Sequence, residues 1–230
     1  MIAENLQRIQ EEIAACAAKR QRAASSGPVK LVAVTKNHTV DAMREAIDAG
    51  ALAIGENRVQ EALGKADTLR RDVEWHLIGH LQTNKVRQAV PLFQLIHSVD
   101  SERLAQEIDR VAKRCGKVQD ILLQVNIASE ESKFGVSKEA ALPFVQFASQ
   151  LENVRLAGLM AIAPHYADAE KTRPLFREMF ELFESLKAMR IPHTNFEWLS
   201  MGMSNDYAVA VEEGANLVRI GTGIFGERQY

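Results

Sequence analysis

Cysteine is scarce in this chain of 230 residues, which contains only Cys16 and Cys115. These two residues lie far apart and do not have the spacing of metal ligands, so the sequence favours a reduced intracellular protein over a disulfide-linked one. Net charge is also low, because 28 basic and 30 acidic side chains leave a formal charge of -2. This balance gives no general reason to expect binding to nucleic acid or to a membrane surface.

Long apolar runs are missing as well. No segment approaches the ~20 consecutive apolar residues of a membrane-spanning helix. The N-terminal segment carries Glu4, Glu11 and Glu12 on a helical pattern, which is unlike a signal peptide. We therefore expect a soluble, cytoplasmic protein.

Several familiar motifs of catalysis and cofactor binding are absent or incomplete. There is no G-x-S-x-G sequence, and neither cysteine has a recognisable catalytic setting. His76 and His80 are four residues apart, but they flank an apolar run rather than sharing a helix face, so we expect no zinc site. Residues 221–226 fit the pattern G-x-G-x-x-G, but the sequence ends at Tyr230, before a helix and a strand could complete a dinucleotide-binding unit. We therefore expect neither a metal nor a dinucleotide.

The apolar residues that are present form short runs, which alternate with helical patterns. Eight runs have the length and composition of strands buried on both faces. They are Leu31–Lys36, Ala51–Gly55, Trp75–Gly79, Phe93–Val99, Asp120–Asn126, Leu156–Ile162, Phe196–Ser200 and Asn216–Ile220. Eight strand–helix units within roughly 200 residues predict an α/β protein with one domain over residues 1–230, a (β/α)8 TIM barrel. An open doubly wound sheet of the same elements is the alternative.

Two expected helices need comment, besides the extra N-terminal helix that we predict over residues 1–24. Ser137 is a suitable N-cap, but Pro143 is awkward inside the helix that follows, so that helix starts at Ser137 or later. The helix over Pro174–Met189 places several phenylalanines on one face, which we interpret as ordinary core.

Lys36 stands at the end of the first run, and in a barrel of this kind ligands bind at the carboxyl ends of the strands. Desolvation there lowers the pKa of an amine and makes it nucleophilic. Such an amine can form a Schiff base with a carbonyl compound. Considered alone, the run is better explained by a lysine whose amine simply reaches water.

Small residues follow the last two strands: Ser200 and Gly202 after the seventh, and Gly221 and Thr222 after the eighth. The corresponding loops are the usual phosphate site of this fold. Small residues let backbone N–H groups approach an anion, and a helix N-terminus favours its charge. We therefore predict that these four residues bind one phosphate group.

Arg219 lies within the eighth strand, and a guanidinium at the end of a barrel needs a partner because it cannot lose its proton. That partner could be Glu56, Asp206 or a ring nitrogen of a ligand held between Lys36 and the phosphate site. An amine, a cation and a phosphate site complement an aldehyde, a pyridine nitrogen and a phosphate. These are the polar groups of pyridoxal 5′-phosphate.

Seven motifs, spread over nearly the whole chain, resemble those of the YggS/PROSC family of pyridoxal phosphate homeostasis proteins. They are LVAVTK (31–36), GENRVQEA (55–62), WHLIGHLQTNK (75–85), VNIASEESKFG (125–135), GLMAI (158–162), LSMGMSNDY (199–207) and VRIGTGIFGER (218–228). The resemblance implies a barrel like the N-terminal domain of alanine racemase. It implies that Lys36 holds the cofactor pyridoxal 5′-phosphate as a Schiff base and that Arg219 faces the pyridine nitrogen. The other implied cofactor-binding residues are Asn57, Met160, Ser200, Met201, Gly202, Gly221 and Thr222.

Catalytic residues are not expected. Racemases of this fold take a second acid/base, a tyrosine, from a separate β domain that we do not expect here. An arginine opposite the ring nitrogen would keep that nitrogen unprotonated and weaken its capacity to accept carbanion charge. We therefore predict a monomeric protein that holds pyridoxal phosphate and delivers it to apo-forms of pyridoxal phosphate-dependent enzymes, without efficient turnover.

Two other functions remain open at this stage. One is a slow racemase-like enzyme that uses pyridoxal phosphate, and the other is a cofactor-free aldolase that forms a Schiff base with its substrate. Lys133, in the loop after the fifth strand, is in addition a candidate for a transient second aldehyde site.

Overall fold

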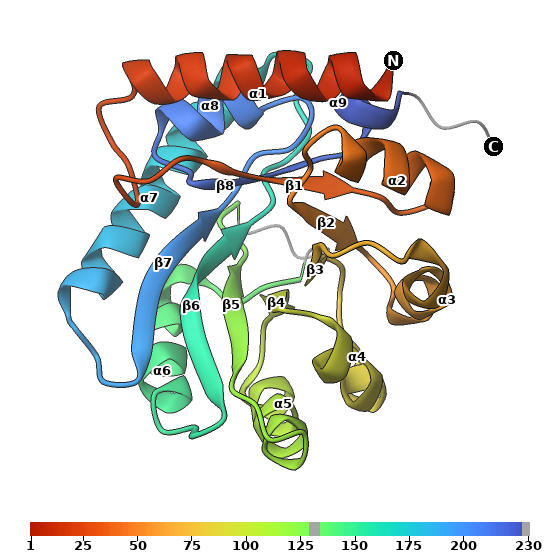
Figure 1. Cartoon of the computed structure of the whole chain (residues 1–230). Coiled ribbons are helices and arrows are strands. Elements are labelled where there is room, and N and C mark those ends of the chain that lie inside the picture. Colours follow the sequence, from red (N-terminus) through yellow and green to blue (C-terminus); the bar gives the residue numbers. More distant parts are fainter. Residues whose placement is uncertain (129–133, 227–230) are drawn as a thin grey trace.

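The computed structural model describes residues 1–128 and 134–226. Within these residues, eight parallel strands form a closed barrel in chain order (Figure 1). The strands are β1 (Lys30–Val34), β2 (Ala53–Glu56), β3 (Glu74–Leu77), β4 (Leu95–Val99), β5 (Gln119–Val125), β6 (Val154–Ala161), β7 (Thr194–Ser200) and β8 (Leu217–Ile220). β8 pairs with β1, with Val32 opposite Arg219. This pairing confirms the predicted TIM barrel and excludes the open sheet.

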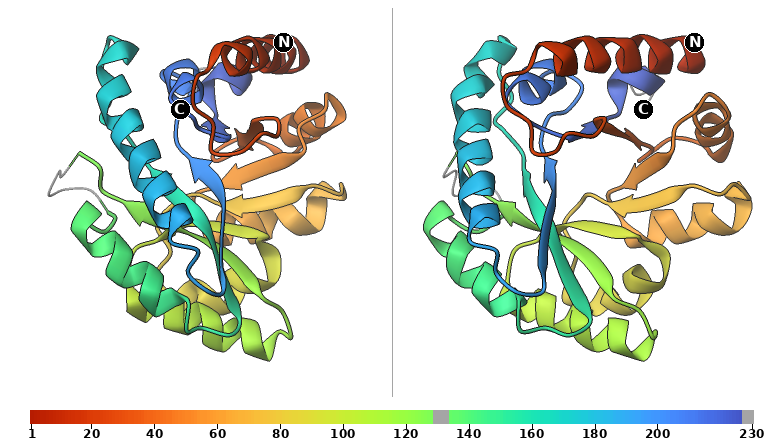
Figure 2. Two further views of the ribbon diagram at one scale, coloured as in Figure 1. Left: turned by 90° about the vertical axis from the view of Figure 1, so that its left-hand side faces the viewer. Right: turned by 60° about the vertical axis from the view of Figure 1, so that its left-hand side comes forward.

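Helices surround the barrel on its outside, as the two views in Figure 2 show. They are α1 (Ile2–Lys19), α2 (Val40–Asp48), α3 (Val59–Leu69), α4 (Val86–Leu92), α5 (Glu102–Arg114), α6 (Lys138–Ala148), α7 (Arg173–Ala188), α8 (Tyr207–Glu212) and α9 (Thr222–Phe225). Two 3-10 turns precede α4 and α7: η1 (Thr83–Lys85) and η2 (Ala169–Thr172). Among the described residues, no helix combines the length and the hydropathy needed to cross a membrane.

Local sequence signals set several helix starts. Thr39, Ser101 and Ser137 are N-caps whose hydroxyls accept a bond from the backbone N–H three residues later. The helix after Ser137 starts directly at Lys138, with Pro143 inside it. The later start that we considered is therefore wrong. The cap stabilises the first turn, and the proline removes only one backbone donor further along the helix.

Two apolar clusters stabilise the fold. The larger one lies between the strands and the surrounding helices. The smaller one contains buried residues from six of the eight strands, among them Val32, Leu122 and Met160. Because successive side chains of a strand point to opposite faces, these residues fill the barrel interior.

The extra N-terminal helix α1 lies across α8 and α9 (Figure 1). Its apolar residues Leu6, Ile9 and Ile13 are buried, and its polar face is exposed. Asn5 Nδ2 donates a hydrogen bond of 3.0 Å to the carbonyl of Ile224 in α9. This contact fixes α9 and the loop that connects it to β8 near the carboxyl ends of the strands.

Candidate functional site

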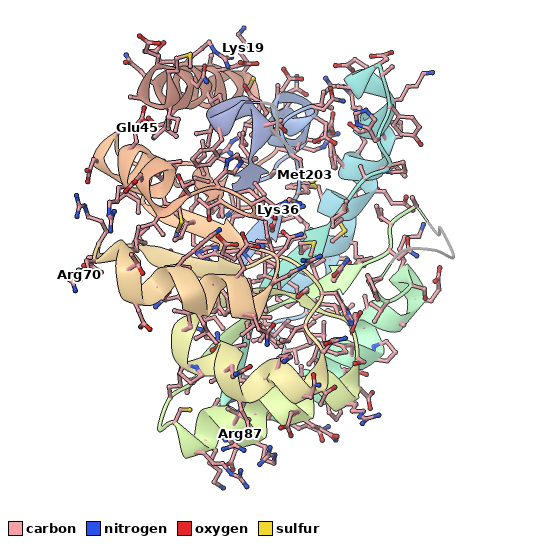
Figure 3. All side chains as sticks on the ribbon, turned by 90° about the vertical axis from the view of Figure 1, so that its right-hand side faces the viewer. Lys19, Lys36, Glu45, Arg70, Arg87 and Met203 are labelled. Carbon is pink, nitrogen blue, oxygen red and sulfur yellow. The ribbon has the colours of Figure 1, made fainter. Side chains whose placement is uncertain are left out.

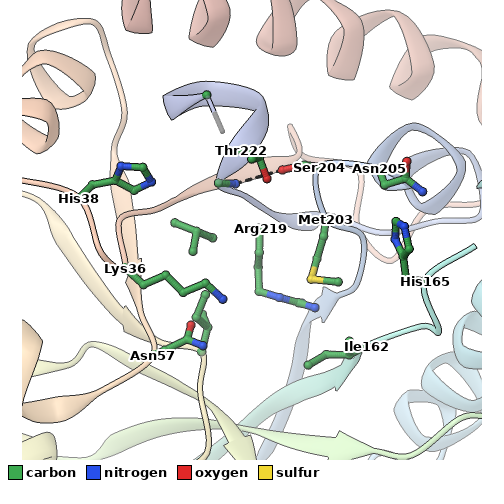
Figure 4. A pocket seen from close by; sticks show the side chains of 14 residues that line it. Lys36, His38, Asn57, Ile162, His165, Met203, Ser204, Asn205, Arg219 and Thr222 are labelled. Atoms are coloured by element: carbon green, nitrogen blue, oxygen red, sulfur yellow. Dashed lines mark hydrogen bonds between the residues drawn. The ribbon is translucent and has the colours of Figure 1, made fainter. Parts of the chain in front are cut away.

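A cavity of about 290 Å³ opens at the carboxyl ends of the strands (Figure 4). Five of the residues predicted from the sequence line it: Lys36, Asn57, Arg219, Gly221 and Thr222. Its volume is at the lower end of the ~300–1,000 Å³ that small-molecule sites usually have. The cavity is therefore suited to a small ligand with one ring.

Lys36 follows β1 and lies near the centre of the ring of helices (Figure 3). Its side chain extends across the cavity toward the region occupied by Asn57 and Arg219 (Figure 4). By contrast, Lys19 lies at the periphery of the molecule in Figure 3. An amine inside a cavity can react with a carbonyl group that the cavity holds.

The backbone beneath Lys36 is held by a buried cluster. The Thr35 hydroxyl donates to Glu56 Oε1 at 2.6 Å, and Lys65 Nζ donates to the same oxygen and to the Thr35 carbonyl, both at 2.8 Å. Burial raises the pKa of the Glu56 carboxyl, and the bonds from Lys65 and Thr35 oppose this shift. Glu56 therefore fixes the end of β1. Its bonds to Thr35 and Lys65 argue against Glu56, one of the three partners considered for Arg219.

Arg219 brings a buried cation to the floor of the cavity. Its side chain donates to Ser200 Oγ and, at 2.9 Å, to the carbonyl of Ala161. Burial lowers the pKa of the guanidinium to about 10, against the effect of the nearby negative charge of Asp206. Arg219 is therefore protonated at pH 7. A guanidinium has five N–H donors, so donors remain for an acceptor in the cavity.

Ser204 also lines the cavity, and its hydroxyl oxygen is the acceptor for two backbone N–H groups. Its Oγ accepts bonds of 3.2 Å from the N–H groups of Gly221 and Gly223. Both bonds use lone pairs of the oxygen and leave the hydroxyl hydrogen for another acceptor. Two donors on one oxygen also polarise its O–H bond, which makes this hydroxyl a stronger donor to an anion. Thr222, exposed beside it, supplies a second hydroxyl.

Four other predicted residues are buried and are not part of the cavity lining: Met160, Ser200, Met201 and Gly202. Met160 belongs to the barrel interior, and Met201 belongs to the outer core. Ser200 contacts Arg219 rather than the cavity. Gly202 has a φ of +94°, and its carbonyl accepts a bond from the Arg219 N–H. The structure thus brings together five of the nine predicted residues in the lining.

Sequence reasoning missed several lining residues: His38, Ile78, Ile162, His165, Met203, Ser204 and Asn205. Five of them lie in loops, whereas Ile78 and Ile162 directly follow β3 and β6 and are apolar, so a search for polar side chains at strand ends passes over them. The motif LSMGMSNDY contains two serines, Ser200 and Ser204, and the sequence alone does not show which of them lines the cavity. His38 stacks on Phe225, with ring centroids 4.5 Å apart, and thereby connects the loop after β1 with α9.

Other candidates from the sequence lie elsewhere. His76 points into the barrel, whereas His80 is exposed and stacks on Phe134. Among the described residues, no group of three or more metal-ligating side chains is assembled. The Tyr207 hydroxyl donates to Glu12 at 2.7 Å, at α1 and away from the cavity. Lys133 lies outside the described residues.

Comparison with known proteins gives a consistent result. Residues 4–229 match the family "Alanine racemase, N-terminal domain". A pyridoxal phosphate homeostasis protein of Aquifex aeolicus is 42% identical over 99% of this chain and 98% of its own length. A protein of the same name from Pseudomonas aeruginosa is 40% identical over 100% of this chain and 96% of its own. PipY of Synechococcus elongatus, whose structure was solved with PLP bound, is 39% identical, with a TM-score of 0.82 over 98% of this chain and 100% of PipY.

Proposed function

This chain belongs to the family of pyridoxal phosphate homeostasis proteins, and we propose that it binds pyridoxal 5′-phosphate reversibly in the cavity at the strand ends. The observation that carries this proposal is the placement of Lys36, Arg219 and Ser204 around one small cavity. The amine complements an aldehyde, the guanidinium complements an unprotonated pyridine nitrogen, and the hydroxyls complement a phosphate. The relative that was solved with PLP bound supports the same ligand.

Lys36 would hold the ligand covalently. Its unprotonated amine adds to the aldehyde carbon, and loss of one water molecule leaves a C=N bond, the Schiff base. Addition of water or of another amine reverses this bond without a net change in oxidation state. The protein can therefore take up the aldehyde, keep it away from other amines and release it.

Arg219 argues against efficient catalysis. When bound, pyridoxal phosphate supplies an electron sink for carbanion chemistry, which works best with a protonated ring nitrogen. A guanidinium remains charged at pH 7 and can only donate, so a nitrogen that accepts its bond stays unprotonated. We therefore infer a role in storing the cofactor and delivering it to apo-forms of pyridoxal phosphate-dependent enzymes. That the protein works as a monomer stays a prediction.

His165 keeps a second function open, a slow amino-acid racemase-like activity. Its side chain lines the cavity together with Lys36, and racemisation requires two groups that exchange protons with the substrate. Release of the second enantiomer from a pure L-amino acid, lost in both Lys36→Ala and His165→Ala, would favour this activity. No racemisation at saturating pyridoxal phosphate favours the carrier.

Absorbance spectroscopy tests the binding proposal. The protein is saturated with pyridoxal phosphate, dialysed and compared with Lys36→Ala and with Lys113→Ala, which changes a lysine of α5 outside the cavity. We expect the visible absorbance band of a Schiff base for the wild type and for Lys113→Ala, and its loss in Lys36→Ala. A colourless wild-type protein after dialysis would refute the proposal.

A further inference from the structure

A chain of hydrogen-bonded side chains crosses the barrel interior from its amino-terminal end to the cavity. Its members, from β3, β4, β7 and β8, are in order Glu74, His76, His97, Ser200 and Arg219. Glu74 Oε2 lies 3.2 Å from His76 Nε2, and His76 Nδ1 lies 3.0 Å from His97 Nε2. His97 Nδ1 lies 3.0 Å from Ser200 Oγ, which accepts a bond from Arg219. We refer to the first four residues as the relay.

The relay is shielded from water except at one end. The exposed fractions of His76, His97 and Ser200 are 1%, 0% and 0%. At the amino-terminal end of the barrel, the carboxylate of Glu74 is about half exposed and accepts a bond of 2.7 Å from Lys30 Nζ. The relay thus connects a surface ion pair with the buried guanidinium of the cavity.

The charges at the two ends determine which atoms carry hydrogen. Arg219 can only donate. The bonds from His76 and Lys30 lower the pKa of the Glu74 carboxyl to about 2, so this group is ionised at neutral pH and can only accept. Burial lowers the pKa of His76 and of His97, and each imidazole is therefore neutral with a single N–H.

Only one arrangement of hydrogens satisfies every pair. The ionised Glu74 can only accept, so His76 donates to it from Nε2 and its Nδ1 is an acceptor. His97 therefore donates from Nε2 to His76 Nδ1, and its own Nδ1 is an acceptor. The Ser200 hydroxyl donates to that Nδ1 and accepts from Arg219. All the N–H and O–H dipoles point from the guanidinium toward the carboxylate, and aligned hydrogen bonds strengthen one another.

We propose that the relay positions Arg219 as a fixed donor toward the ring nitrogen of the ligand and brings the negative charge of Glu74 to bear on it. The identity of that ligand rests on the proposed function. The arrangement explains how the guanidinium is held although, among the described residues, its side chain donates hydrogen bonds only to Ser200 Oγ and the Ala161 carbonyl. On this basis the relay residues are positioning residues, because none of them lines the cavity.

A purely structural role is the competing interpretation, in which the relay only satisfies polar groups in the barrel interior. Both interpretations expect a less stable protein when a member is removed, since an unsatisfied buried polar group is costly. They differ in the selectivity of the cavity for a ring that contains nitrogen, which only the positioning role predicts.

Nitrogen-15 NMR of the imidazoles in the ligand-free wild-type protein tests the direction of the relay. We expect His76 and His97 to be neutral at pH 7, each with hydrogen on Nε2 and none on Nδ1. Glu74→Gln removes the end charge and is expected to alter the signals of His76. A wild-type protein with either imidazole charged, or with hydrogen on Nδ1, would overturn the proposal, whether or not the protein binds pyridoxal phosphate.

Ligand binding tests the positioning role. Dissociation constants are measured for pyridoxal phosphate and for its carbocyclic analogue, in which a C–H group replaces the ring nitrogen. Ser200→Ala is expected to weaken binding of pyridoxal phosphate by about 5- to 30-fold, the factor that accompanies loss of one buried hydrogen bond. It should leave binding of the analogue nearly unchanged.

Matched variants separate this effect from general damage to the barrel. Ser98 is an equally buried serine of β4 whose hydroxyl donates to the Gly79 carbonyl at 2.6 Å, outside the relay. Ser98→Ala should not change the preference for the ring nitrogen, and Ser200→Thr, which keeps the hydroxyl, should restore it. Equal losses for both ligands in Ser200→Ala, or no loss, would overturn the positioning role. A wild-type protein that binds neither compound would instead refute the proposed function.

Discussion

Under the proposed function, Arg219 and Ser204 recognise different groups of the ligand, because Arg219 is a buried cation and Ser204 has a hydroxyl that accepts bonds from two backbone N–H groups. The guanidinium is already desolvated in the folded protein, so an acceptor that enters the cavity finds a donor that is already oriented. The hydroxyl supplies a donor without adding a full charge. In the proposed function, the cation would contact the ring nitrogen and the hydroxyl would contact the phosphate.

Ser204→Ala is expected to weaken binding of pyridoxal phosphate by about 1.5–3 kcal/mol, the usual size of a hydrogen bond to a charged group. The same substitution should barely affect pyridoxal, which lacks the phosphate. Equilibrium dialysis with both compounds measures the difference. Equal losses for the two ligands would mean that Ser204 does not bind the phosphate.

The site residues that could be predicted from the sequence are those at or near the ends of strands. Lys36, Asn57 and Arg219 could be found because they lie at or near strand ends, where the barrel fold directs side chains toward ligands. The sequence could not distinguish Ser200 from Ser204. Their roles depend on which serine faces inward along β7 and which one lies in the loop that approaches the backbone after β8.

At the scale of elements, the loop between β7 and α8 owes its shape to Gly202. The backbone there has a φ of +94°, which side chains other than glycine rarely adopt. A Cβ at this position would lie 2.6 Å from Ala210 Cβ and 3.0 Å from Tyr207 Cα. The loop therefore packs on α8 at a distance that only glycine permits, and its carbonyl is thereby held for the Arg219 N–H.

Gly202→Ala should lower the free energy of unfolding by about 1–3 kcal/mol more than Gly50→Ala does. Gly50 is the matched control because its φ of +104° carries the same conformational penalty, while a Cβ there would meet nothing within 4 Å. Urea denaturation of the three proteins measures the difference. Equal losses would show that close packing on α8 contributes nothing.

Helix starts were the part of the fold that depended least on tertiary contacts. The caps Thr39, Ser101 and Ser137 could be recognised locally, and the helix that begins at Lys138 tolerates Pro143. The contact of α1 with α8 and α9 could not be predicted, because it joins the two ends of the chain.

At the scale of the whole molecule, the barrel interior combines an apolar cluster with two buried histidines. Eight apolar runs in a single chain made barrel closure predictable. The contact of His76 with His97, and of His97 with Ser200, was not predictable. It depends on inward-facing positions of β3, β4 and β7, which only the closed barrel brings together. The same burial makes the stability of the protein sensitive to acid.

Stability should fall as the pH decreases below about 6.5, the ordinary pKa of histidine. The pKa values of His76 and His97 are lowered in the folded protein, so the unfolded chain binds more protons in this range. Their contribution is complete above pH 6.5 and is lost as the pH falls toward the folded pKa values, by up to about 1.4 kcal/mol per pH unit for each histidine. Urea denaturation at several pH values measures the slope.

His97→Gln should reduce this slope by an amount that corresponds to up to one proton bound on unfolding, about 1.4 kcal/mol per pH unit. This holds whatever the substitution does to stability at pH 7. Leu122→Ala is the control, since it removes apolar volume from the same interior without removing a titratable group. The contribution of Glu74, whose pKa is lowered to about 2, is lost only as the pH falls below about 4.5. Equal slopes in the wild type and in His97→Gln would contradict the neutral, buried state of His97.

Chemical trapping tests most directly whether Lys36 is the residue that binds the aldehyde. The protein is saturated with pyridoxal phosphate, reduced with borohydride so that any C=N bond becomes permanent, digested and analysed by mass spectrometry. We expect the phosphopyridoxyl group on the peptide that contains Lys36, and none on the corresponding peptide of Lys36→Ala. A reduced wild-type protein that carries the group on other lysines, with Lys36 unmodified, would contradict the account.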